Sequence, residues 1–525
     1  MYLLIPMSGQ GNRFKDKGYA QPKPLIPVND EPIIQRLLQS FPLHWKAVFV
    51  LAENHKGTGL EELLKKLRPD SKVLYIEQHK FGPSYAALKG LESIPESEQV
   101  LVSYCDYGMI WDPYQFEKYV NETKCDACLV SYRGFHPHYL SPTMYAYSRL
   151  VNDNVVEVKE KGSFTANREH EFASCGAYYF KSASLLKKAI DYQLENKFQL
   201  NGEYYTSLTV QALIQMQPQS LVKVFEMPYF FQWGTPEDLQ YFEYWEKTFK
   251  NYNRFSTHDS SYVVDQVLMP MAGAGSRFGA LTNTAKPLIP INDRPMYKWA
   301  LHSLPRAAKN HFVVGQTFAS LVNEDPKDLT VLDKMTEGQA ITTQLGLSNL
   351  AADKDIVVSS CDHSIVLDSV KWKNFKNLKN VDAAIFVIKN FPGTLRSPNS
   401  YAYVEVDAGD NSEFKKVKSV SVKKPISDEP QNDFLLVGTF WFKNKNVAEA
   451  GIKSVVDKNV RVNNEYYLDS VFTELIASGQ SVVIIPLDGY INWGDPGSLS
   501  EALYWHECFS GFKLAPRSAF QGVQL

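Results

Sequence analysis

The chain contains one unusual stretch of sequence twice. IPMSGQGNRFKDKGYAQPKPLIPVNDEPI begins at Ile5, and MPMAGAGSRFGALTNTAKPLIPINDRPM begins at Met269. Further matching segments follow in the same order in both halves: VSYCDYGMIWD and VSSCDHSIVLD, SPTMYAY and SPNSYAY, GEYYTSL and NEYYLDS, and FQWGTPEDL and INWGDPGSL. Self-similarity of this kind indicates a duplicated fold. Any architecture predicted for the first half must therefore also suit the second.

The duplication and the chain length together predict two domains. At 525 residues the chain is longer than one hydrophobic core usually supports. The second copy of the motif begins soon after KNYNRFSTHDSSY, a polar stretch typical of a loop. We therefore predict a first domain over 1–249, a linker over 250–262 and a second domain over 263–525.

Short apolar runs alternate with helical patterns within each half. KAVFVLA, KVLYIE and QVLVSYCD are typical of buried strands, whereas PIIQRLLQSF and YAALKGLESI have helical spacing. Strands that alternate with helices favour a mainly parallel sheet with helices on both faces. Each half is therefore predicted to be a Rossmann-like, three-layer α/β/α sandwich, and the whole chain a tandem pair.

Composition argues against several classes of function. The chain is 22% charged with a net charge of -3, whereas proteins that bind a nucleic-acid backbone are usually basic. No window reaches the roughly 18 apolar residues of a membrane helix. The start of the chain is strand-like and lacks a basic and apolar leader. We expect a cytoplasmic protein that binds neither nucleic acid nor membrane, and the oligomeric state stays open.

Two short motifs suggest metal or redox chemistry in the first half alone. CDAC contains Cys125 and Cys128, but the second half has Val381 and Ala384 at the matching positions. Buried thiols behave as small apolar residues, so we interpret the pair as strand core. The two histidines of GFHPHY face NFPGTL in the second half. Only one half of the chain could then use them to bind a metal, and we do not favour this role.

The duplicated motif combines two glycines, an arginine and a lysine placed before the string PLIP. The residues are Gly9, Gly11, Arg13 and Lys23 in the first copy and Gly273, Gly275, Arg277 and Lys286 in the second. Glycines at the end of a strand let backbone N–H groups approach an anion, and arginine adds a forked donor. The spacing differs from that of a P-loop and lacks the third glycine of the dinucleotide fingerprint. Structural need alone could explain the glycines, but the two cations favour a phosphate-binding loop.

GQGNRF…QPKP resembles the signature of the nucleotidyltransferases that make nucleotide sugars and related head groups, G-x-G-x-R followed by P-K. GAGSRF…AKP fits except that Ala285 replaces the proline. The resemblance covers nearly the whole chain. It implies that a sugar 1-phosphate or similar phosphomonoester attacks the α-phosphate of CTP, UTP or another nucleoside triphosphate, and that pyrophosphate leaves. Arg13 and Arg277 would hold the β- and γ-phosphates, and Lys23 and Lys286 would neutralise charge at the α-phosphate.

The resemblance also implies a Mg²⁺ site in each half. The family's metal aspartate closes a buried strand, as Asp106 and Asp362 do in VLVSYCD and IVVSSCD. A second ligand comes from a late W-x-D-x-G-T-P-like segment, where Gln232 and Asn492 stand in this chain. Asparagine has precedent there, whereas glutamine is longer and less usual. Mg²⁺ suits one or two such oxygen ligands plus phosphates, although a lone aspartate after a strand can also be a turn former.

Nucleotide recognition in the family uses a glycine before a helix, which lets the base lie against the backbone. Gly82 and Gly338 occupy this position in EQHKFGPSYAALKGL and KMTEGQAITTQLGL. The side chains around the two glycines differ. The two pockets therefore need not read the same base.

The acceptor side is expected to differ most between the halves. The family holds sugar and phosphate with Glu-Lys near a strand end, and VEVKEKG supplies Glu160 and Lys161. VSVKKP places Lys423 and Lys424 there in the second half, so a carboxylate is lost and a cation added. The second site should prefer a more anionic or differently substituted partner, unless these are simply exposed charges. The glycines assigned to the same acceptor sites are Gly176 and Gly438.

Three hypotheses follow from these motifs. The leading one is an enzyme with two nucleotidyltransferase sites for different substrates, supplying precursors of a surface polysaccharide. In the second, one half, in particular the second, only binds nucleotide or supports its partner, although neither half has lost its lysine or aspartate. The third is a glycosyltransferase that uses a nucleotide sugar. Such enzymes usually hold metal through Asp-x-Asp, whereas these strands end in CDYG and CDHS.

Overall fold

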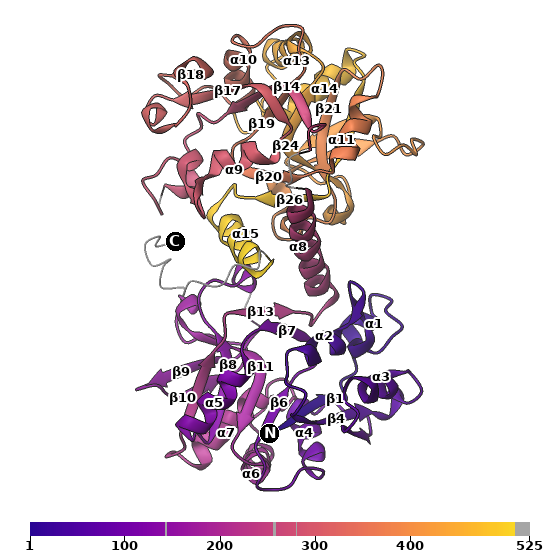
Figure 1. The fold of residues 1–525 in the computed structure, drawn as a ribbon, viewed down its shortest axis with the longest axis vertical. Helices are drawn as coiled ribbons and strands as arrows, with labels where there is room; N and C mark the ends of the chain where they lie inside the picture. Colours follow the sequence, from indigo (N-terminus) through magenta and orange to yellow (C-terminus); the bar gives the residue numbers. More distant parts are fainter. Residues whose placement is uncertain (142–143, 256–258, 280, 510–525) are drawn as a thin grey trace. The chain divides into compact units, whose positions relative to one another are not determined.

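The computed structural model divides the chain into two compact units, Met1–Glu243 and Tyr244–Leu525 (Figure 1). It describes residues 1–141, 144–255, 259–279 and 281–509. Helix α8 (Pro236–Phe255) runs through the boundary between the units, so the predicted linker over 250–262 begins within a helix. The domain limits inferred from the sequence remain a prediction.

One mixed sheet forms the centre of the first unit. Its strand order is β10-β9-β11-β6-β1-β4-β5, and β8 pairs with β11 and β12. The strands are β1 (Tyr2–Met7), β4 (Lys46–Ala52), β5 (Lys72–Ile76), β6 (Val100–Ser103), β8 (Ala127–Tyr132), β9 (Tyr147–Val151), β10 (Asn154–Lys159), β11 (Phe172–Phe180) and β12 (Val222–Glu226). β1 is parallel to β4 and β6, and β4 to β5, whereas β11 runs antiparallel to β6.

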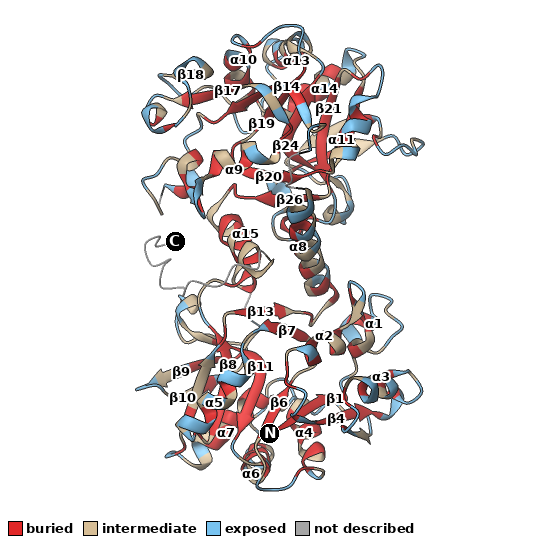
Figure 2. Ribbon diagram, viewed as in Figure 1, coloured by how far each residue is buried: buried red, intermediate tan, exposed pale blue. Residues whose placement is uncertain are grey.

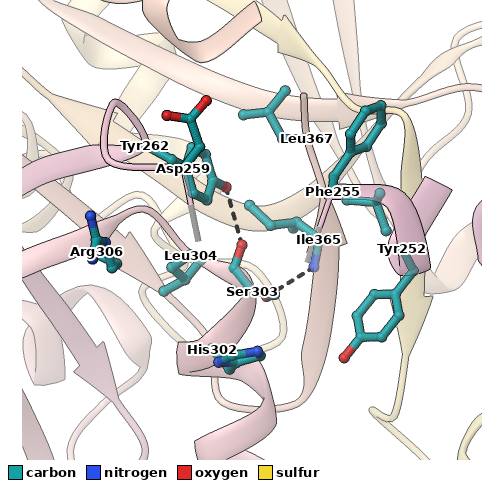
Figure 3. Close-up of a pocket in the computed structure, with 11 residues that line it drawn as sticks. Tyr252, Phe255, Asp259, Tyr262, His302, Ser303, Leu304, Arg306, Ile365 and Leu367 are labelled. Atoms are coloured by element: carbon teal, nitrogen blue, oxygen red, sulfur yellow. Dashed lines mark hydrogen bonds between the residues drawn. The ribbon is translucent and has the colours of Figure 1, made fainter. Parts of the chain in front are cut away.

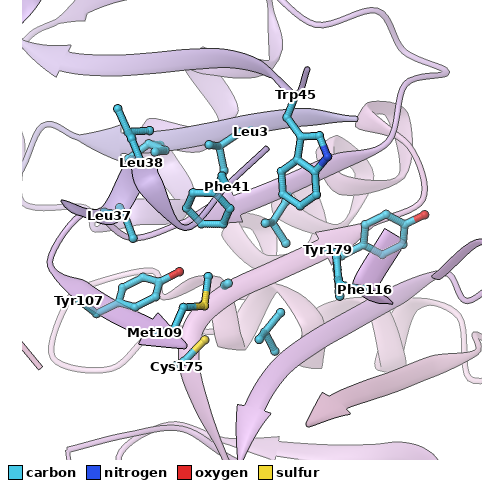
Figure 4. Close-up of a cluster of buried hydrophobic side chains, with 14 of the residues drawn as sticks. Leu3, Leu37, Leu38, Phe41, Trp45, Tyr107, Met109, Phe116, Cys175 and Tyr179 are labelled. Carbon is cyan, nitrogen blue, oxygen red and sulfur yellow. The ribbon is translucent and has the colours of Figure 1, made fainter. Parts of the chain in front are cut away.

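Helices cover both faces of this sheet. They are α2 (Ile33–Gln39), α3 (Leu60–Leu67), α4 (Pro83–Leu91), α5 (Pro113–Thr123), α6 (Ala183–Glu195) and α7 (Thr206–Met216), in addition to the short α1 (Asn12–Lys15). Side chains alternate along β1, as the pleat of a strand requires. Leu3 packs with Leu37 and Phe41 on one face (Figure 4). Leu4 packs with Ala87 on the other. The predicted three-layer sandwich is confirmed.

The second unit repeats this architecture. Its sheet has the order β18-β17-β14-β19-β24-β21-β25, with β22 and β23 attached through β24. The strands are β14 (Val263–Pro270), β17 (Arg306–Gly315), β18 (Leu329–Leu332), β19 (Ile356–Ser359), β21 (Ala383–Ile388), β22 (Ala402–Val406), β23 (Val417–Val422), β24 (Phe434–Phe442) and β25 (Val482–Pro486). The helices are α9 (Met296–Ser303), α10 (Gln339–Leu347), α11 (Ser369–Lys376), α12 (Gly393–Arg396), α13 (Lys445–Asp457), α14 (Asp469–Ala477) and α15 (Pro496–Phe509).

Two-stranded pairs lie beside each main sheet. β7 (Tyr107–Ile110) pairs with β13 (Tyr229–Gln232) in the first unit, and β20 (His363–Val366) pairs with β26 (Gly489–Asn492) in the second. β2 (Pro27–Val28) pairs with β3 (Glu31–Pro32), and β15 (Pro290–Ile291) with β16 (Arg294–Pro295). The strands of these pairs lie within the duplicated motifs or overlap them. They carry the site segments described below.

Burial follows the layers of each unit. The strands of both sheets are largely buried, and helices expose one face (Figure 2). Cys125 and Cys128 are free thiols inside the core of the first unit, which confirms their interpretation as core residues. His138 is also buried, with its Nδ1 2.7 Å from His136 Nδ1 and 2.9 Å from the Tyr132 hydroxyl. No described helix combines the length and apolar character needed to cross a membrane.

Candidate functional site

The first glycine of each phosphate loop has no steric reason to be a glycine. Gly9 and Gly273 follow the ends of β1 and β14 and are exposed. A Cβ added at either position would meet no atom within 4 Å. Their backbone therefore lies open, as close approach by a phosphate requires. This geometry fits the predicted anion-binding role.

The second glycine of each loop is needed by the turn itself. Gly11 and Gly275 have φ of +65° and +61°, a left-handed conformation that other residues adopt only with strain. A Cβ would lie 3.7 Å from the Cβ of Lys23 in the first unit and 2.8 Å from that of Lys286 in the second. The loop thus lies directly against the lysine that both copies of the motif contain.

In the first unit the lysine bridges two distant segments. Lys23 begins the 3-10 turn η1 (Lys23–Leu25), and the following proline fixes the backbone there. Its Nζ donates to Asp106 Oδ2 at 2.5 Å and to the Gly234 carbonyl at 2.8 Å. The ammonium, the strand-end carboxylate and the late W-G segment therefore meet at one point.

The second unit repeats this arrangement. Lys286 begins η6 (Lys286–Leu288), and its Nζ donates to Asp362 Oδ2 at 2.6 Å and to the Gly494 carbonyl at 3.1 Å. Burial alone would raise the pKa of Asp362, but Lys286 and His363 hold that pKa well below its ordinary value. The carboxylate is therefore ionised at any physiological pH.

Strand pairing places the late segments beside the aspartates. Gln232 of β13 lies opposite Tyr107, and Trp233 N–H donates to the Asp106 carbonyl at 3.0 Å. In the second unit Asn492 lies opposite His363. These antiparallel pairs bring together residues far apart in the chain, as the motif resemblance implied.

The oxygen donors of the second unit are suited to a small hard cation. A Cβ added at Gly494 would lie 3.0 Å from Asn492 Oδ1 and 3.4 Å from Asp362 Oδ2, so both oxygens flank the same glycine. Asn492 Oδ1 already accepts the Gly494 N–H at 3.0 Å. Among the described residues, no group of three or more acidic, histidine or cysteine side chains is placed to hold a metal ion. A Mg²⁺ ion here would take its remaining ligands from substrate phosphates and water.

The first unit has an additional carboxylate that the sequence analysis missed. A Cβ added at Gly234 would lie 3.5 Å from Asp238 Oδ2 and 3.8 Å from Asp106 Oδ2. Gln232 instead turns its amide Nε2 to the Tyr145 hydroxyl. Ser498 stands in the second unit where Asp238 stands in the first. This difference between WGTPED and WGDPGS was the available signal.

A tyrosine in each unit also belongs to the site and was missed. Burial raises the pKa of Tyr145 well above its ordinary value; Asp238 and Asp106 add to this, and Arg13 opposes it. Tyr401, the matching residue of SPNSYAY, has its pKa raised to about 12 by burial, with Arg277 among the opposing groups. Each tyrosine is therefore within electrostatic reach of its phosphate-loop arginine. The duplication of this motif was the signal for it.

Gly82 and Gly338 are fixed by backbone packing. Their φ values are +86° and +126°, and a Cβ would lie 2.8 Å from the backbone N of Tyr204 or 2.6 Å from that of Tyr466. The surrounding side chains differ between the units, as expected. In the first unit His79 stacks on Phe81 and donates to or accepts from Ser8 Oγ at 3.0 Å. In the second, Met335 and Glu337 stand at these positions.

The strand register corrects the alignment of the acceptor segments. Tyr147 of β9 pairs with Lys159, whereas its counterpart Tyr403 of β22 pairs with Ser421. Lys159 therefore matches Ser421. Counting on from this pair, Val422 matches Glu160 and Lys423 matches Lys161. Both lysines have a left-handed backbone, with φ of 52° and 60°. The sequence alignment had set Lys423 against Glu160.

The same β-bulge occurs in both hairpins, between Val155 and Glu157 in the first unit and between Glu405 and Val406 in the second. Because the two bulges lie at matching positions, they do not shift one unit against the other. VSVKKP contains two adjacent lysines, and either can be aligned with Lys161 of VEVKEKG when the strand pairing is unknown. Lys424 comes after Lys423, the residue that matches Lys161, and it is exposed.

The remaining glycines assigned to the acceptor lie at bulges of the central strands. Gly176 of β11 has φ of +100°, and a Cβ there would lie 3.0 Å from the ring of Tyr104. Gly438 of β24 has φ of +78°, with Ser360 Oγ 3.3 Å from an added Cβ. Both glycines thus lie against the residue two positions before the strand-end aspartate, Asp106 or Asp362. Their left-handed backbone is therefore also a structural reason for glycine at these two positions.

A separate pocket lies in the second unit, away from these residues (Figure 3). Tyr262 and Phe255 line it together with His302. Ile365 N–H donates to Ser303 Oγ at 3.1 Å within it. None of the predicted site residues lines this pocket in the part of the chain that the structure describes.

Two segments of the chain, 3–165 and 268–395, match the family model described as "MobA-like NTP transferase domain". Among relatives, the bifunctional protein GlmU of Thermosipho melanesiensis is 23% identical over 211 residues, which cover 39% of this chain and 42% of that protein. GlmU of Thermosipho africanus is 23% identical over 210 residues with the same coverage. The chain thus spans under half the length of these relatives.

Solved structures also align with about half of the chain. The nucleoside-diphosphate-sugar pyrophosphorylase from Vibrio cholerae RC9 has 16% identity and a TM-score of 0.38, covering 45% of this chain and 97% of that one. The inositol-1-phosphate CTP transferase from T. maritima has 15% identity and a TM-score of 0.38, covering 48% and 99%.

Proposed function

This chain belongs to the family of MobA-like NTP transferase domains, and from that premise we propose that both units are active nucleotidyltransferases with different substrates. Each would transfer a nucleoside monophosphate from a nucleoside triphosphate to a sugar 1-phosphate or similar phosphomonoester. The acceptor phosphate oxygen attacks the α-phosphorus, the bond from that phosphorus to the bridging oxygen breaks, and pyrophosphate leaves. The products would serve as precursors of a surface polysaccharide.

One observation carries this proposal. In both units a lysine from the phosphate loop meets a strand-end aspartate and the carbonyl of the late W-G segment, at 2.5 and 2.8 Å in one and 2.6 and 3.1 Å in the other. A structural ion pair alone would not need open glycine backbone beside it. The second unit retains every member of the set, which favours two active sites over one active and one supporting unit.

The residues of the first site would have separate roles. The open backbone at Gly9 and the exposed Arg13 bind the β- and γ-phosphates. Lys23 is held in place by Asp106 and the Gly234 carbonyl, so its charge is positioned before the α-phosphate arrives. Preorganised charge of this kind stabilises the negative charge that spreads over phosphate oxygens in the transition state.

The second unit uses Gly273, Arg277 and Lys286 in the same way. A bound Mg²⁺ ion would neutralise phosphate charge in each site, held by Asp106 with Gln232 or Asp238 in the first unit and by Asp362 with Asn492 in the second. Aromatic residues at the first base pocket and Met335 at the second support different bases.

The test is pyrophosphate release by the full-length chain, with several nucleoside triphosphates against a panel of sugar phosphates and other phosphorylated head groups. Lys23→Ala and Lys286→Ala should each remove a different activity by at least ~10²-fold, the scale for one preorganised charge stabiliser. If Lys286→Ala leaves every transferase activity unchanged, the second unit is not an enzyme. If the wild-type chain releases nucleoside diphosphate instead of pyrophosphate, it is a glycosyltransferase.

A further inference from the structure

The acceptor side of the first unit pairs a strand residue with a helix residue. Glu160 directly follows β10, and Ser207 lies in the first turn of α7. Ser207 Oγ donates to Glu160 Oε2 at 2.5 Å. Beside them, Lys161 Nζ donates to the Tyr205 hydroxyl at 2.8 Å. The carboxylate and the ammonium both follow β10, and each contacts a hydroxyl group at the start of α7.

The second unit has a similar arrangement, but its carboxylate lies on the helix and not at the end of the strand. The lysines match, because Lys161 Nζ lies 4.7 Å from the ring centroid of Tyr205 and Lys423 Nζ lies 5.8 Å from that of Tyr467. GEYYTSL and NEYYLDS align without a gap, so Asp469 occupies the position of Ser207.

The strand partner has changed at the same time. Val422 occupies the position of Glu160, according to the hairpin register. Asp469 is half-buried at the start of α14 and attracts Lys423 electrostatically. The pair Glu160 and Ser207 has therefore become Val422 and Asp469.

We propose that Asp469 is the acceptor-recognising carboxylate of the second unit, transferred from the strand to the helix relative to Glu160 in the first. This inference rests on the proposed function. Each site then has one carboxylate and one lysine, so the two acceptors carry the same charge. The more anionic acceptor expected from the sequence alignment is no longer required, because the register leaves one lysine at the matched position and Asp469 supplies a carboxylate in place of the one that the strand has lost.

The chemistry of the ligand follows from these two charges. A carboxylate binds either a hydroxyl or an ammonium group of an acceptor. Lys423 lies close enough to Asp469 to oppose a second cation, so we assign the hydroxyl. The second acceptor is therefore a hydroxylated phosphomonoester whose recognised hydroxyl faces the helix instead of the strand.

The two units also differ beside the start of this helix. In the first unit the Tyr104 ring lies against Gly176, and its hydroxyl accepts the Thr206 N–H at 3.3 Å. In the second unit Ser360 stands at this position, and Gln339 Nε2 donates to its Oγ at 2.9 Å. The aromatic ring beside the helix start is thus replaced by a small polar group.

The test is a set of variants of the full-length chain, measured by pyrophosphate release with the KM for acceptor and for nucleotide determined separately. Asp469→Asn keeps the shape and removes the charge. It should raise the acceptor KM of the second activity by about 10- to 100-fold, as expected for loss of a charged hydrogen bond, with the nucleotide KM unchanged. Thermal unfolding of the variant checks that it folds.

A double variant tests whether the acceptor is recognised from the helix or from the strand. Val422→Glu combined with Asp469→Ser installs the arrangement of the first unit, and should restore acceptor binding with a preference among sugar-phosphate stereoisomers different from that of the wild type. Unchanged acceptor KM in Asp469→Asn, alongside normal pyrophosphate release, would overturn this assignment alone. Absence of any activity that depends on Lys286 would overturn the proposed function of the unit and this inference with it.

Discussion

The glycines of the two motifs serve different physical purposes. Gly9 leaves open space above an ordinary backbone, whereas Gly82 has a left-handed φ of +86° and backbone atoms of Tyr204 2.8 Å from any added Cβ. Both look alike in the sequence. The first can be explained by an approaching ligand, and the second is explained by folding.

This distinction predicts opposite phenotypes for two alanine variants. Gly82→Ala should destabilise the first unit by about 1–3 kcal/mol, the scale of such backbone strain, and lower its Tm by several degrees. Gly9→Ala should leave the Tm unchanged and raise the KM for nucleoside triphosphate. Calorimetry and pyrophosphate kinetics on the same samples measure both. A drop in Tm for Gly9→Ala equal to that of Gly82→Ala would contradict the argument.

At the scale of elements, helix starts and hairpin ends would form the proposed acceptor sites. α7 and α14 begin beside the ends of β10 and β23, and each pair of elements supplies one carboxylate. Asp469 is poorly placed for stability. Burial raises its pKa to about 6, against the opposing effect of Lys423.

A pH dependence follows from that shift. Unfolded aspartate titrates near ~3.9, so the folded chain holds its proton more tightly, and the free energy of unfolding should fall as pH rises from about 4 to about 6. Asp469→Asn should remove this decline and be the more stable protein above pH 6. Urea unfolding between pH 4.5 and 8 measures it.

Asp410→Asn provides the control for this experiment. Hydrogen bonds from Ser412 lower the pKa of Asp410 to about 2, so that carboxyl is ionised in both states above pH 5. Its removal should change stability by an amount that does not vary between pH 5 and 8. A difference between Asp469→Asn and the wild type that is likewise independent of pH would show that Asp469 does not titrate as described.

At the scale of the whole chain, the two units share one strand order and one arrangement of lysine, aspartate and carbonyl. They differ at Asp238, at the base pocket and at the acceptor pair. Under the proposed function, the shared parts would carry out phosphate chemistry, and the divergent parts would recognise the substrates. This division is what duplication followed by specialisation would produce.

The shared parts predict a common dependence on a divalent cation. A chelator should abolish both activities. Asp106→Asn and Asp362→Asn should each abolish only the activity of their own unit, because the amide removes the charge with little change of shape. Pyrophosphate release with added Mg²⁺ is the measurement. Retention of either activity in excess chelator would exclude the metal from that site.

Much of the architecture was predictable from the sequence. The duplication, the alternation of apolar runs with helical patterns and the paired glycine motifs predicted two mainly parallel α/β/α sandwiches, and the fold confirms them. These features are local and periodic, so they are visible along the chain. The position of Asp106 and Asp362 after buried strands was visible for the same reason.

The meeting of residues across the chain was decided by the tertiary structure. The contact of Lys23 with the Gly234 carbonyl, the approach of Asp238 and the position of Tyr145 depend on how β13 pairs with β7 and where α8 begins. The acceptor pair depended on the strand pairing, which shows that Lys423 and not the adjacent Lys424 matches Lys161. Long-range pairing and register are set by packing over the whole sheet, which the local pattern does not encode.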